Sequence, residues 1–280
     1  MDIYTFMIII TGTAIVAGII GALIGLGGGI IITPFLVIAF GIDIRYAMGA
    51  ALTSVIATSS GAAAAYVRDG ISNLKIGMFL SIATTLGAVF GAFLALHTNV
   101  NILSITFGIA LLITAALSLM KKSQVKAGKP SSTLATKLQL PSTYPDPDEH
   151  RNISYPVFGV TSGFLVMYVA GILSGLLGIG SGAFKVLGMD QIMKIPFKVT
   201  TATSNFMIGV TAAASIGIYL KQGYIDPVLV APVALGVLCG AFIGARIMPY
   251  VPIKILKIIF LIAIVVIGIQ MILRGFQIAA

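Results

Sequence analysis

The stretch Gly25-Leu26-Gly27-Gly28-Gly29 recurs 153 residues later as Gly178-Ile179-Gly180-Ser181-Gly182. Two more motifs recur at the same offset and in the same order. They are Tyr66-Val67-Arg68-Asp69-Gly70 with Tyr219-Leu220-Lys221-Gln222-Gly223, and Gly87-Ala88-Val89-Phe90-Gly91-Ala92 with Gly240-Ala241-Phe242-Ile243-Gly244-Ala245. Three motifs that share one offset indicate an internal duplication. We expect a first repeat in residues 1–120 and a second repeat in residues 155–280.

The composition predicts a membrane protein. Hydrophobic residues make up 58% of the 280 residues and charged residues only 9%, whereas a soluble domain carries about 25% charged residues. A helix that spans a ~30 Å hydrocarbon core needs about 20 apolar residues and satisfies its own backbone hydrogen bonds. We therefore predict an all-α polytopic protein that crosses the cell membrane (plasma or inner) many times. The expected helical segments are 3–26, 29–41, 46–66, 74–96, 100–120, 156–179, 183–195, 197–220, 227–249 and 253–274.

The net charge of +9 has an ordinary explanation in such a protein. Basic residues sit at the ends of apolar segments and in one central loop, as the positive-inside rule expects, so we predict membrane lipid and no nucleic acid as partners. The single cysteine, Cys239, can form neither an intramolecular disulfide nor a thiolate cluster. No motif indicates a metal or a cofactor. Met1-Asp2-Ile3-Tyr4 lacks a basic n-region, so we expect the first segment to remain as a membrane helix.

Residues 121–154 differ from the rest of the chain because they are polar and contain four prolines. We expect them to form a solvated, partly disordered cytoplasmic linker between the repeats. An acidic cluster beside His150 is more simply part of a hydrated loop than a metal site. The basic residues of the linker are Lys121, Lys122, Lys126, Lys129, Lys137 and Arg151.

The distribution of charge also predicts how the repeats are oriented. If the linker is cytoplasmic and each repeat crosses an odd number of times, only Arg45, Lys221 and Arg274 lie outside. If each repeat crosses four times, the outside residues are Arg45, Lys194, Lys198, Arg246, Lys254 and Lys257. The positive-inside rule favours the first arrangement. We therefore predict two inverted repeats, with the amino terminus outside and about eight spanning helices in all.

Segments 29–41 and 183–195 are too short for a normal span, because 13 residues make only ~20 Å of helix. Each follows one of the glycine-rich stretches, and each glycine in a helix interior costs up to about 1 kcal/mol relative to alanine. Interrupted backbone at membrane depth is tolerated only where protein buries it or where it lines a cavity. We expect two half-helices or re-entrant segments, with the glycine loops inside the membrane.

The glycine loops are the first candidate site, because a half-helix that starts inside the membrane presents free N–H groups and a partial positive charge to an anion. Lys185 adds a full charge in the second repeat, and an ionisable residue inside the membrane is a functional candidate. In the alternative interpretation the glycines allow close helix packing and Lys185 snorkels to an interface. The candidate substrate-binding residues of the loops are Gly27, Gly28, Gly29, Gly180, Ser181, Gly182 and Lys185.

Polar side chains one helix later are the second group of candidates. Thr53-Ser54 and Thr203-Ser204-Asn205 could bind a substrate or satisfy broken backbone nearby, although such residues also hydrogen-bond between helices. The two Thr-Ser pairs are offset by slightly less than the other motifs, which predicts a small insertion or deletion between the repeats. Small-residue seams at Gly87 and Gly91, and at Gly236, Gly240 and Gly244, indicate helix packing.

These motifs together resemble the TauE/SafE family, the sulfite exporter or toluene sulfonate uptake permease family. The resemblance lies in the duplicated Gly-x-Gly-Gly/Ser-Gly loop, in Ile-Ile-Ile-Thr-Pro34 after the first copy, and in Ala-x-x-Thr53-Ser54. It covers nearly the whole chain outside the linker and implies a transporter of sulfite, sulfonates or related organosulfur anions. The second copy departs from the pattern, because Leu187 stands where the first copy has Pro34 and Lys185 is added.

The leading hypothesis is a secondary transporter of a small sulfur-containing anion that alternates its access between inverted repeats. H⁺ and Na⁺ both remain open as the coupling ion, and a carboxylate proton relay is not expected because the segments contain few acids. A channel, or a transporter of another small anion or a carboxylate, is the alternative. An intramembrane hydrolase is remote, because Ser181 would need a base within hydrogen-bond reach and the chain has only His97 and His150. We therefore expect that the protein is not an enzyme.

Overall fold

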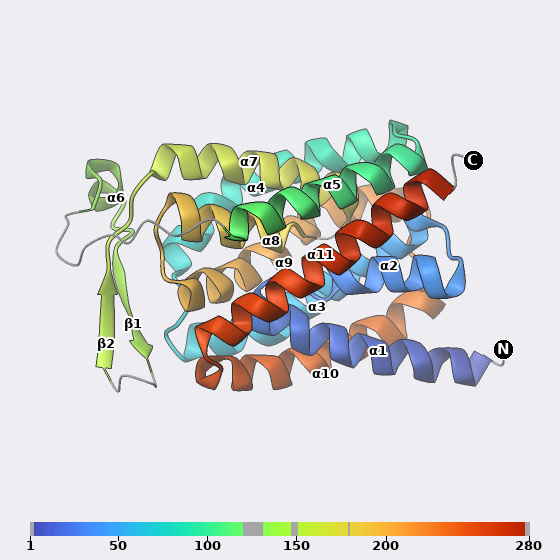
Figure 1. The fold of residues 1–280 in the computed structure, drawn as a ribbon, viewed down its shortest axis with the longest axis horizontal. Coiled ribbons are helices and arrows are strands. Elements are labelled where there is room, and N and C mark those ends of the chain that lie inside the picture. The colour runs from blue at the N-terminus through green and yellow to red at the C-terminus, as the bar shows by residue number, and fades with distance from the viewer. Residues whose placement is uncertain (1–2, 120–130, 147–150, 179, 278–280) are drawn as a thin grey trace.

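The computed structural model describes residues 3–119, 131–146, 151–178 and 180–277 (Figure 1). The elements of the first repeat are α1 (Ile3–Ile24), α2 (Gly29–Phe40), α3 (Ile44–Arg68), α4 (Leu74–His97) and α5 (Val100–Leu119). The elements of the second repeat are α7 (Val160–Leu177), α8 (Gly182–Leu187) with the π-helix η1 (Gly188–Ile192), α9 (Phe197–Lys221), α10 (Pro227–Ile247) with the 3-10 turn η2 (Met248–Tyr250), and α11 (Ile253–Gln277). The predicted all-α class is confirmed.

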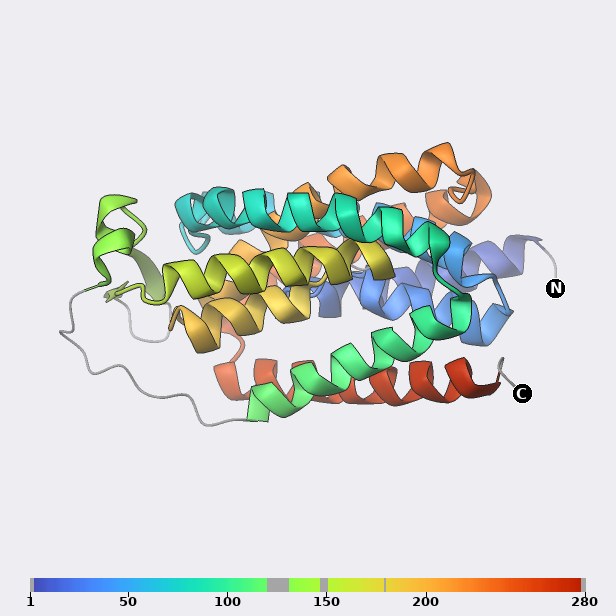
Figure 2. The same cartoon turned by 90° about the horizontal axis from the view of Figure 1, so that it is seen from above.

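Among the described residues, six helices are long and apolar enough to cross a membrane, namely α1, α3, α4, α7, α9 and α10. Helices α5 and α11 are also mainly apolar over their 20 and 25 residues, and Val100–Ile113 and Ile264–Phe276 are stretches of them in which every residue is described. These two helices pack against each other along one side of the bundle (Figure 2). The predicted number of about eight spans requires both of them to cross as well.

The start of several helices follows from a capping side chain. Asp43 accepts a hydrogen bond from the Arg45 backbone N–H at 2.8 Å at the start of α3. Asn73 does the same for Ile76 at the start of α4, at 3.1 Å. Such caps satisfy backbone donors that have no partner within the helix. They fix the turns at the two ends of the bundle and leave the middle to apolar packing.

The two repeats run in opposite directions. In Figure 1, α1 leads from the end that carries both termini toward the end that carries the strands, whereas α7 leads the opposite way. The same reversal holds for each later pair of equivalent helices. The predicted inverted arrangement is therefore confirmed as part of the fold.

The two repeats are related by a pseudo-two-fold axis, and each residue of the first repeat corresponds to the residue 153 positions later in the second. Equivalent contacts show this correspondence. The Tyr66 hydroxyl donates to Ala22 O at 3.0 Å, and its counterpart Tyr219 donates to Gly175 O at 2.9 Å. Likewise α1 packs along α10 while α7 packs along α4. The small-residue seams lie in these two contacts: a Cβ at Gly240 would overlap the backbone of α1, and a Cβ at Gly87 would overlap that of α7. The seams are packing positions, as predicted.

Both short helices return toward the end from which their repeat enters. The rings of Phe6 in α1 and Phe40 at the end of α2 lie 5.0 Å apart, so α2 comes back beside the start of α1. In the second repeat, Phe158 N donates to Met193 O at 3.2 Å, so the segment after η1 comes back beside the start of α7. The expectation of short segments after the glycine loops is confirmed, and both segments re-enter.

The sequence predicts a solvated, partly disordered linker, and the part of it that the structure describes is folded. Helix α6 (Thr133–Lys137) and the antiparallel strands β1 (Ser142–Asp146) and β2 (Arg151–Tyr155) form a cap, which we define as residues 131–146 and 151–157. Asn73 Nδ2 donates to Leu140 O at 2.9 Å and to the Tyr155 hydroxyl at 2.8 Å. The cap also buries apolar side chains against α4, α9 and the segment after η1. Residues 120–130 and 147–150, with His150 and part of the acidic cluster, lie outside the described residues.

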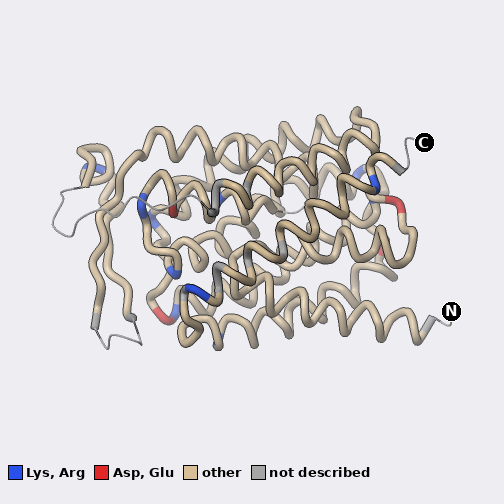
Figure 3. The backbone as a smooth tube through the Cα atoms, viewed as in Figure 1, with Lys and Arg blue, Asp and Glu red and all other residues tan. Residues whose placement is uncertain are grey.

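The charged residues gather at the two ends of the bundle, and the long middle is almost free of them (Figure 3). Lys and Arg are more numerous at the end that carries the cap than at the end that carries the termini (Figure 3). This is the asymmetry on which the inverted arrangement was predicted. It supports a cytoplasmic position for the cap by the positive-inside rule.

Candidate functional site

The two glycine loops, residues 25–28 and 178–181, come together inside the bundle. Residue 179 of the second loop lies outside the described residues. Gly27 and Gly180 are equivalent and both have left-handed backbone conformations, with φ of +75° and +73°. A Cβ at either position would crowd Val55 of α3 and Ile208 of α9, which are also equivalent to each other. Only glycine accommodates this backbone and this space. The pseudo-two-fold axis therefore passes close to both loops.

The loops also touch directly. A Cβ added to Gly182 would lie 2.6 Å from Leu26 Cα, so the start of α8 rests on the first loop. The Ser204 hydroxyl of α9 donates to Gly25 O at 2.8 Å and lies 3.4 Å from Gly182 O. Ser204 is fully buried and joins the two loops across 179 positions of the chain. One predicted site residue is thus at the junction itself.

Asn205 lies beside this junction, and the oxygen of its side-chain amide has no hydrogen-bond partner among the described residues. Its Nδ2 donates to Ala22 O at 3.0 Å and to Thr201 O at 3.1 Å. Its Oδ1, Ser181 Oγ and Thr201 Oγ1 are buried and have no hydrogen-bond partner among the described residues. An unpartnered buried polar atom costs about 1–3 kcal/mol. A polar ligand held between the loops would satisfy such atoms.

The other predicted hydroxyls do not reach the loops. Thr53 and Ser54 donate to Gly49 O and Ala51 O within their own helix α3. Thr203 accepts a hydrogen bond from the Asn73 backbone N–H at 3.0 Å, on the side of α9 that faces the start of α4. The two Thr-Ser pairs therefore have different environments.

The predicted insertion or deletion between the repeats is wrong. Equivalent contacts hold the 153-residue offset on both sides of the Thr-Ser pairs, at Gly27 with Gly180 and at Tyr66 with Tyr219. The resemblance between the pairs is therefore a coincidence of sequence. The true counterparts of Ser54 and Ser204 are Met207 and Ala51, respectively.

Lys185 is completely buried, which excludes the alternative in which it snorkels to an interface. Its Nζ atom donates to Gly180 O at 2.9 Å, to Thr211 Oγ1 at 2.7 Å and to Met207 O at 3.5 Å. These three acceptors from the described residues are all uncharged. Lys185 therefore places a basic group beside the second glycine loop, with neutral oxygens around it.

Two threonines that the sequence analysis did not select also contact the glycine loops or Lys185. Thr58 accepts a hydrogen bond from the Gly28 backbone N–H at 3.1 Å, and its counterpart Thr211 binds the Lys185 Nζ atom. Each also donates to a carbonyl one turn earlier in its own helix, Ser54 O or Met207 O. Their common offset of 153 residues is the signal that could have identified them.

The starts of the two half-helices are unequal. The Gly28 N–H at the start of α2 is already engaged by Thr58. Helix α8 has only 6 residues before it widens into the π-helix η1. One N–H group at the start of α2 is therefore not free, and α8 is too short to present a substantial helix dipole. The anion site at two helix N-termini stays a prediction.

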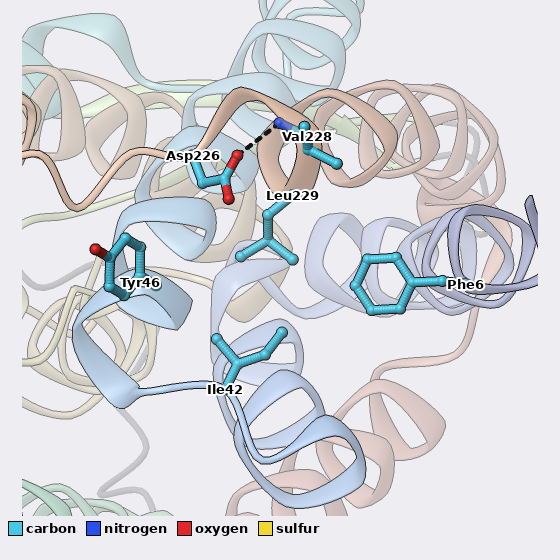
Figure 4. Close-up of a pocket in the computed structure, with 6 residues that line it drawn as sticks. All are labelled: Phe6, Ile42, Tyr46, Asp226, Val228 and Leu229. Atoms are coloured by element: carbon cyan, nitrogen blue, oxygen red, sulfur yellow. Dashed lines mark hydrogen bonds between the residues drawn. The ribbon is translucent and has the colours of Figure 1, made fainter. Parts of the chain in front are cut away.

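A separate pocket of about 260 Å³ lies at the end of the bundle that carries the termini (Figure 4). Figure 4 shows Phe6, Ile42, Tyr46 and Leu229 facing this space. The Asp226 carboxylate accepts a hydrogen bond from the Val228 backbone N–H at 2.9 Å and so caps α10. The other side chains that line the pocket are mainly apolar. It forms a recess in one end of the protein and does not include the loop junction.

Comparisons with known proteins agree with this architecture. The sequence model of the family described as Sulfite exporter TauE/SafE matches residues 10–271. The chain is 30% identical to the probable membrane transporter protein YunE of Bacillus subtilis over 96% of this chain and 98% of that protein. It is 30% identical to the probable membrane transporter protein YdhB of the same organism (86% and 89%) and 26% identical to MJ0441 of Methanocaldococcus jannaschii (95% and 95%). No solved structure matches the chain significantly.

Proposed function

Because this chain belongs to the sulfite exporter TauE/SafE family, it is a multi-pass membrane transporter, and we propose that its cargo is a small sulfur-containing anion. Sulfite, thiosulfate, a sulfonate or a related organosulfur anion would fit this description. The relatives are named only as probable membrane transporters, so the proposed substrate class rests on the family description and on the site.

The observation that carries the proposal is the burial of the Lys185 amino group. This group is fully buried in the bundle beside the meeting point of the glycine loops, and its hydrogen-bond acceptors among the described residues are neutral. A buried charge without a counter-charge is costly, by several kcal/mol even after relaxation. A bound anion would supply the counter-charge, so the site selects for negative solutes.

The proposed binding groups surround this charge. Lys185 provides the attraction, and Asn205 and Ser181 offer polar atoms that lack partners in the described part of the chain. Ser204 holds the two loops together, and the glycines at 27–29 and 180–182 let the backbones approach the anion closely. Oxyanions such as sulfite suit the Lys185 and Ser181 donors, because each oxygen can accept several hydrogen bonds. The unpartnered Asn205 Oδ1 atom is an acceptor, so it would pair only with a ligand that carries a proton, such as a protonated oxyanion.

The inverted repeats suggest how the anion would cross. Helix α2 lies between the loop junction and the end that carries the termini, and α8 with η1 lies between the junction and the cap. Movement of one re-entrant segment would open the junction to one side of the membrane while the other segment keeps it closed. This is alternating access between two inverted repeats around a central site. Either H⁺ or Na⁺ would serve as the coupling ion, with the amino terminus outside and the cap in the cytoplasm.

Flux measurements on purified protein in proteoliposomes test the proposal. Radiolabelled sulfite, thiosulfate, sulfate, a sulfonate and a small carboxylate should be compared with and without ion gradients. We expect saturable flux of at least one sulfur anion, and acceleration of that flux when the same unlabelled anion is present on the far side. Flux of the carboxylate alone would move the protein to another substrate class, and non-saturable flux would favour a channel.

Variants of lysine link the flux to the site. Lys185→Ala should remove most of the flux, whereas the matched control Lys221→Ala, at the exposed end of α9, should retain it. Partial recovery of Lys185→Ala by added methylammonium would show that the missing positive charge is the cause. Flux that is unchanged in Lys185→Ala would contradict the assigned role.

A further inference from the structure

We infer that Lys185 is also the proton-binding group of the transport cycle, so that the carrier moves its anion together with H⁺. The inference rests on the proposed function, because it assigns the coupling ion to the side chain that holds the anion. The Lys185 Nζ atom is surrounded by hydrogen-bond partners that suit both of its protonation states, and the described part of the first repeat has no equivalent group of partners.

The three partners of the nitrogen are of two kinds. Gly180 O at 2.9 Å and Met207 O at 3.5 Å are carbonyl oxygens, which can only accept hydrogen bonds. Thr211 Oγ1 at 2.7 Å belongs to a hydroxyl, which can both accept and donate. An ammonium group needs three acceptors, and these atoms supply them. A neutral amine needs two acceptors and one donor, which the same atoms supply once the Thr211 hydroxyl turns its proton toward the nitrogen.

The Thr211 proton has a partner in either state. While Lys185 is an ammonium group, the Thr211 hydroxyl can donate to Met207 O at 2.7 Å or to Thr84 Oγ1 at 3.1 Å. Thr84 directs its own proton to Ser81 O at 3.2 Å, so its oxygen can accept. The site therefore fits both protonation states of Lys185 by rotation of one hydroxyl, without movement of the backbone.

The first repeat lacks this arrangement. At the 153-residue offset, the counterparts of Lys185 and Thr84 are Ile32 and Val237, both apolar and buried. Thr58, the counterpart of Thr211, is engaged instead by the Gly28 N–H. Symmetric packing alone would not place a basic group and a second hydroxyl within hydrogen-bond distance of one threonine in only one copy. The asymmetry is therefore better explained by a chemical function of this cluster.

The elements packed against α8 carry few other titratable groups among the described residues. Helices α5 and α7 carry no Lys, Arg, Asp or Glu in their described residues, and Tyr168 of α7 is 38% exposed. On η1, Asp190 interacts with Gln191 Nε2 at 3.0 Å. On α9, Lys198 is near the cap end, where it donates to Pro249 O at 3.1 Å, and Tyr219 binds Gly175 O. Lys185, by contrast, donates directly to a carbonyl of the second glycine loop.

The coupled step balances in protons and charge. With the site open to one side, the Nζ lone pair binds H⁺ from water and the resulting ammonium group attracts the anion. Both cross together while the site is closed. On the other side the anion leaves, the N–H bond breaks, the electron pair stays on nitrogen and H⁺ returns to water. For a monovalent anion, neither the loaded nor the empty carrier then holds an uncompensated charge in the apolar centre, where such a charge is costly.

The test separates anion exchange from proton-driven accumulation. Proteoliposomes that contain wild-type protein should accumulate the transported anion when the outside is made more acidic, up to about tenfold per pH unit for one H⁺ per monovalent anion. Lys185→Arg keeps the positive charge but does not release its proton. Any exchange of labelled for unlabelled anion that this variant retains should be independent of the pH gradient, so the ratio of proton-driven accumulation to exchange should fall to near zero. Proton movement into the lumen, followed with a pH-sensitive dye during anion entry into wild-type vesicles, gives a readout that needs no variant.

Threonine variants provide the matched control. Thr211→Val removes the hydroxyl that can switch, whereas Thr58→Val removes its counterpart in the first repeat. The ratio of proton-driven accumulation to exchange should fall for Thr211→Val and stay near the wild-type value for Thr58→Val. Exchange without any response to the pH gradient in wild type, or proton-driven accumulation by Lys185→Arg, would overturn the inference and leave the transporter proposal standing. Absence of exchange in wild type would instead refute the proposed function.

Discussion

Replacement of Ser204 by alanine tests whether the loop junction holds the two repeats together. The lost hydroxyl donates to Gly25 O at 2.8 Å, and Gly25 is buried in the bundle. An unpartnered buried carbonyl costs about 1–3 kcal/mol, while hydrogen bonds between membrane helices average about 0.6 kcal/mol and reach about 1.7 kcal/mol. We therefore expect Ser204→Ala to lower the free energy of unfolding by about 1–2 kcal/mol.

Ser54→Ala is the matched control for this variant. The Ser54 hydroxyl donates to Ala51 O within α3 at 2.8 Å, where the carbonyl also belongs to the helical ladder. Its loss should cost less than about 0.5 kcal/mol, as is usual for substitutions that disturb no special contact. With about 2–4 °C per kcal/mol for a chain of 150–250 residues, the expected decrease in Tm is about 2–8 °C for Ser204→Ala and under about 2 °C for Ser54→Ala.

The assay should follow the fraction of monodisperse protein in detergent after heating, because the chain has no tryptophan for intrinsic fluorescence. Anion exchange measured on the same preparations shows whether a loosened junction also slows transport. Equal shifts of Tm in the two variants would refute the reasoning, because the Thr-Ser pairs would then be equivalent after all.

Three further predictions concern packing, the cap and orientation. Gly240→Leu should abolish the yield of monodisperse protein because its side chain would overlap α1, whereas Gly217→Leu, with no atom within 4 Å of a Cβ, should be tolerated. Burial raises the pKa of the Tyr155 phenol above its usual 10.0, so the stability from the neutral buried phenol is present below pH ~10 and lost as the pH rises further. Limited proteolysis of the cap should accelerate above that pH in wild type, and Tyr155→Phe should remove this pH dependence. After replacement of the single native cysteine, a membrane-impermeant thiol reagent should label Lys221→Cys from outside and Ser142→Cys only in opened cells; labelling of both from outside would contradict the orientation.

The helices and their inversion were predictable because the signals are physical and long. A membrane span must be apolar over about 20 residues, and basic residues collect on one side. The glycine loops likewise predicted interrupted helices, since glycine is costly inside a helix and useful where backbones meet. The sequence did not predict that Phe40 lies beside Phe6 or that Met193 lies beside Phe158. These positions depend on tertiary contacts, which the periodicity of the sequence does not reveal.

The cap was missed because its local sequence argues against it. Strand β1 contains Pro145, and a proline within a run usually indicates a loop or an edge. Its fold is stabilised instead by contacts with the bundle, such as those of Leu140 and Tyr155 with Asn73. Short strands of this kind obtain their stability from tertiary packing, which outweighs their weak intrinsic preference.

The central cluster combines symmetric support with asymmetric chemistry. Contacts that brace the two re-entrant hairpins, Tyr66 with Ala22 and Tyr219 with Gly175, are nearly identical, so neither end is held closed more firmly by these bonds. An alternating carrier benefits from this balance, because a strong preference for one closed end would trap it. The binding charge does not need a copy in each repeat, since the loops meet near the axis and Lys185 binds a carbonyl of the second loop there. A second lysine in place of Ile32 would add a like charge in an apolar interior, where repulsion is strong. One basic side chain in a two-fold scaffold is therefore what a carrier of a small anion requires.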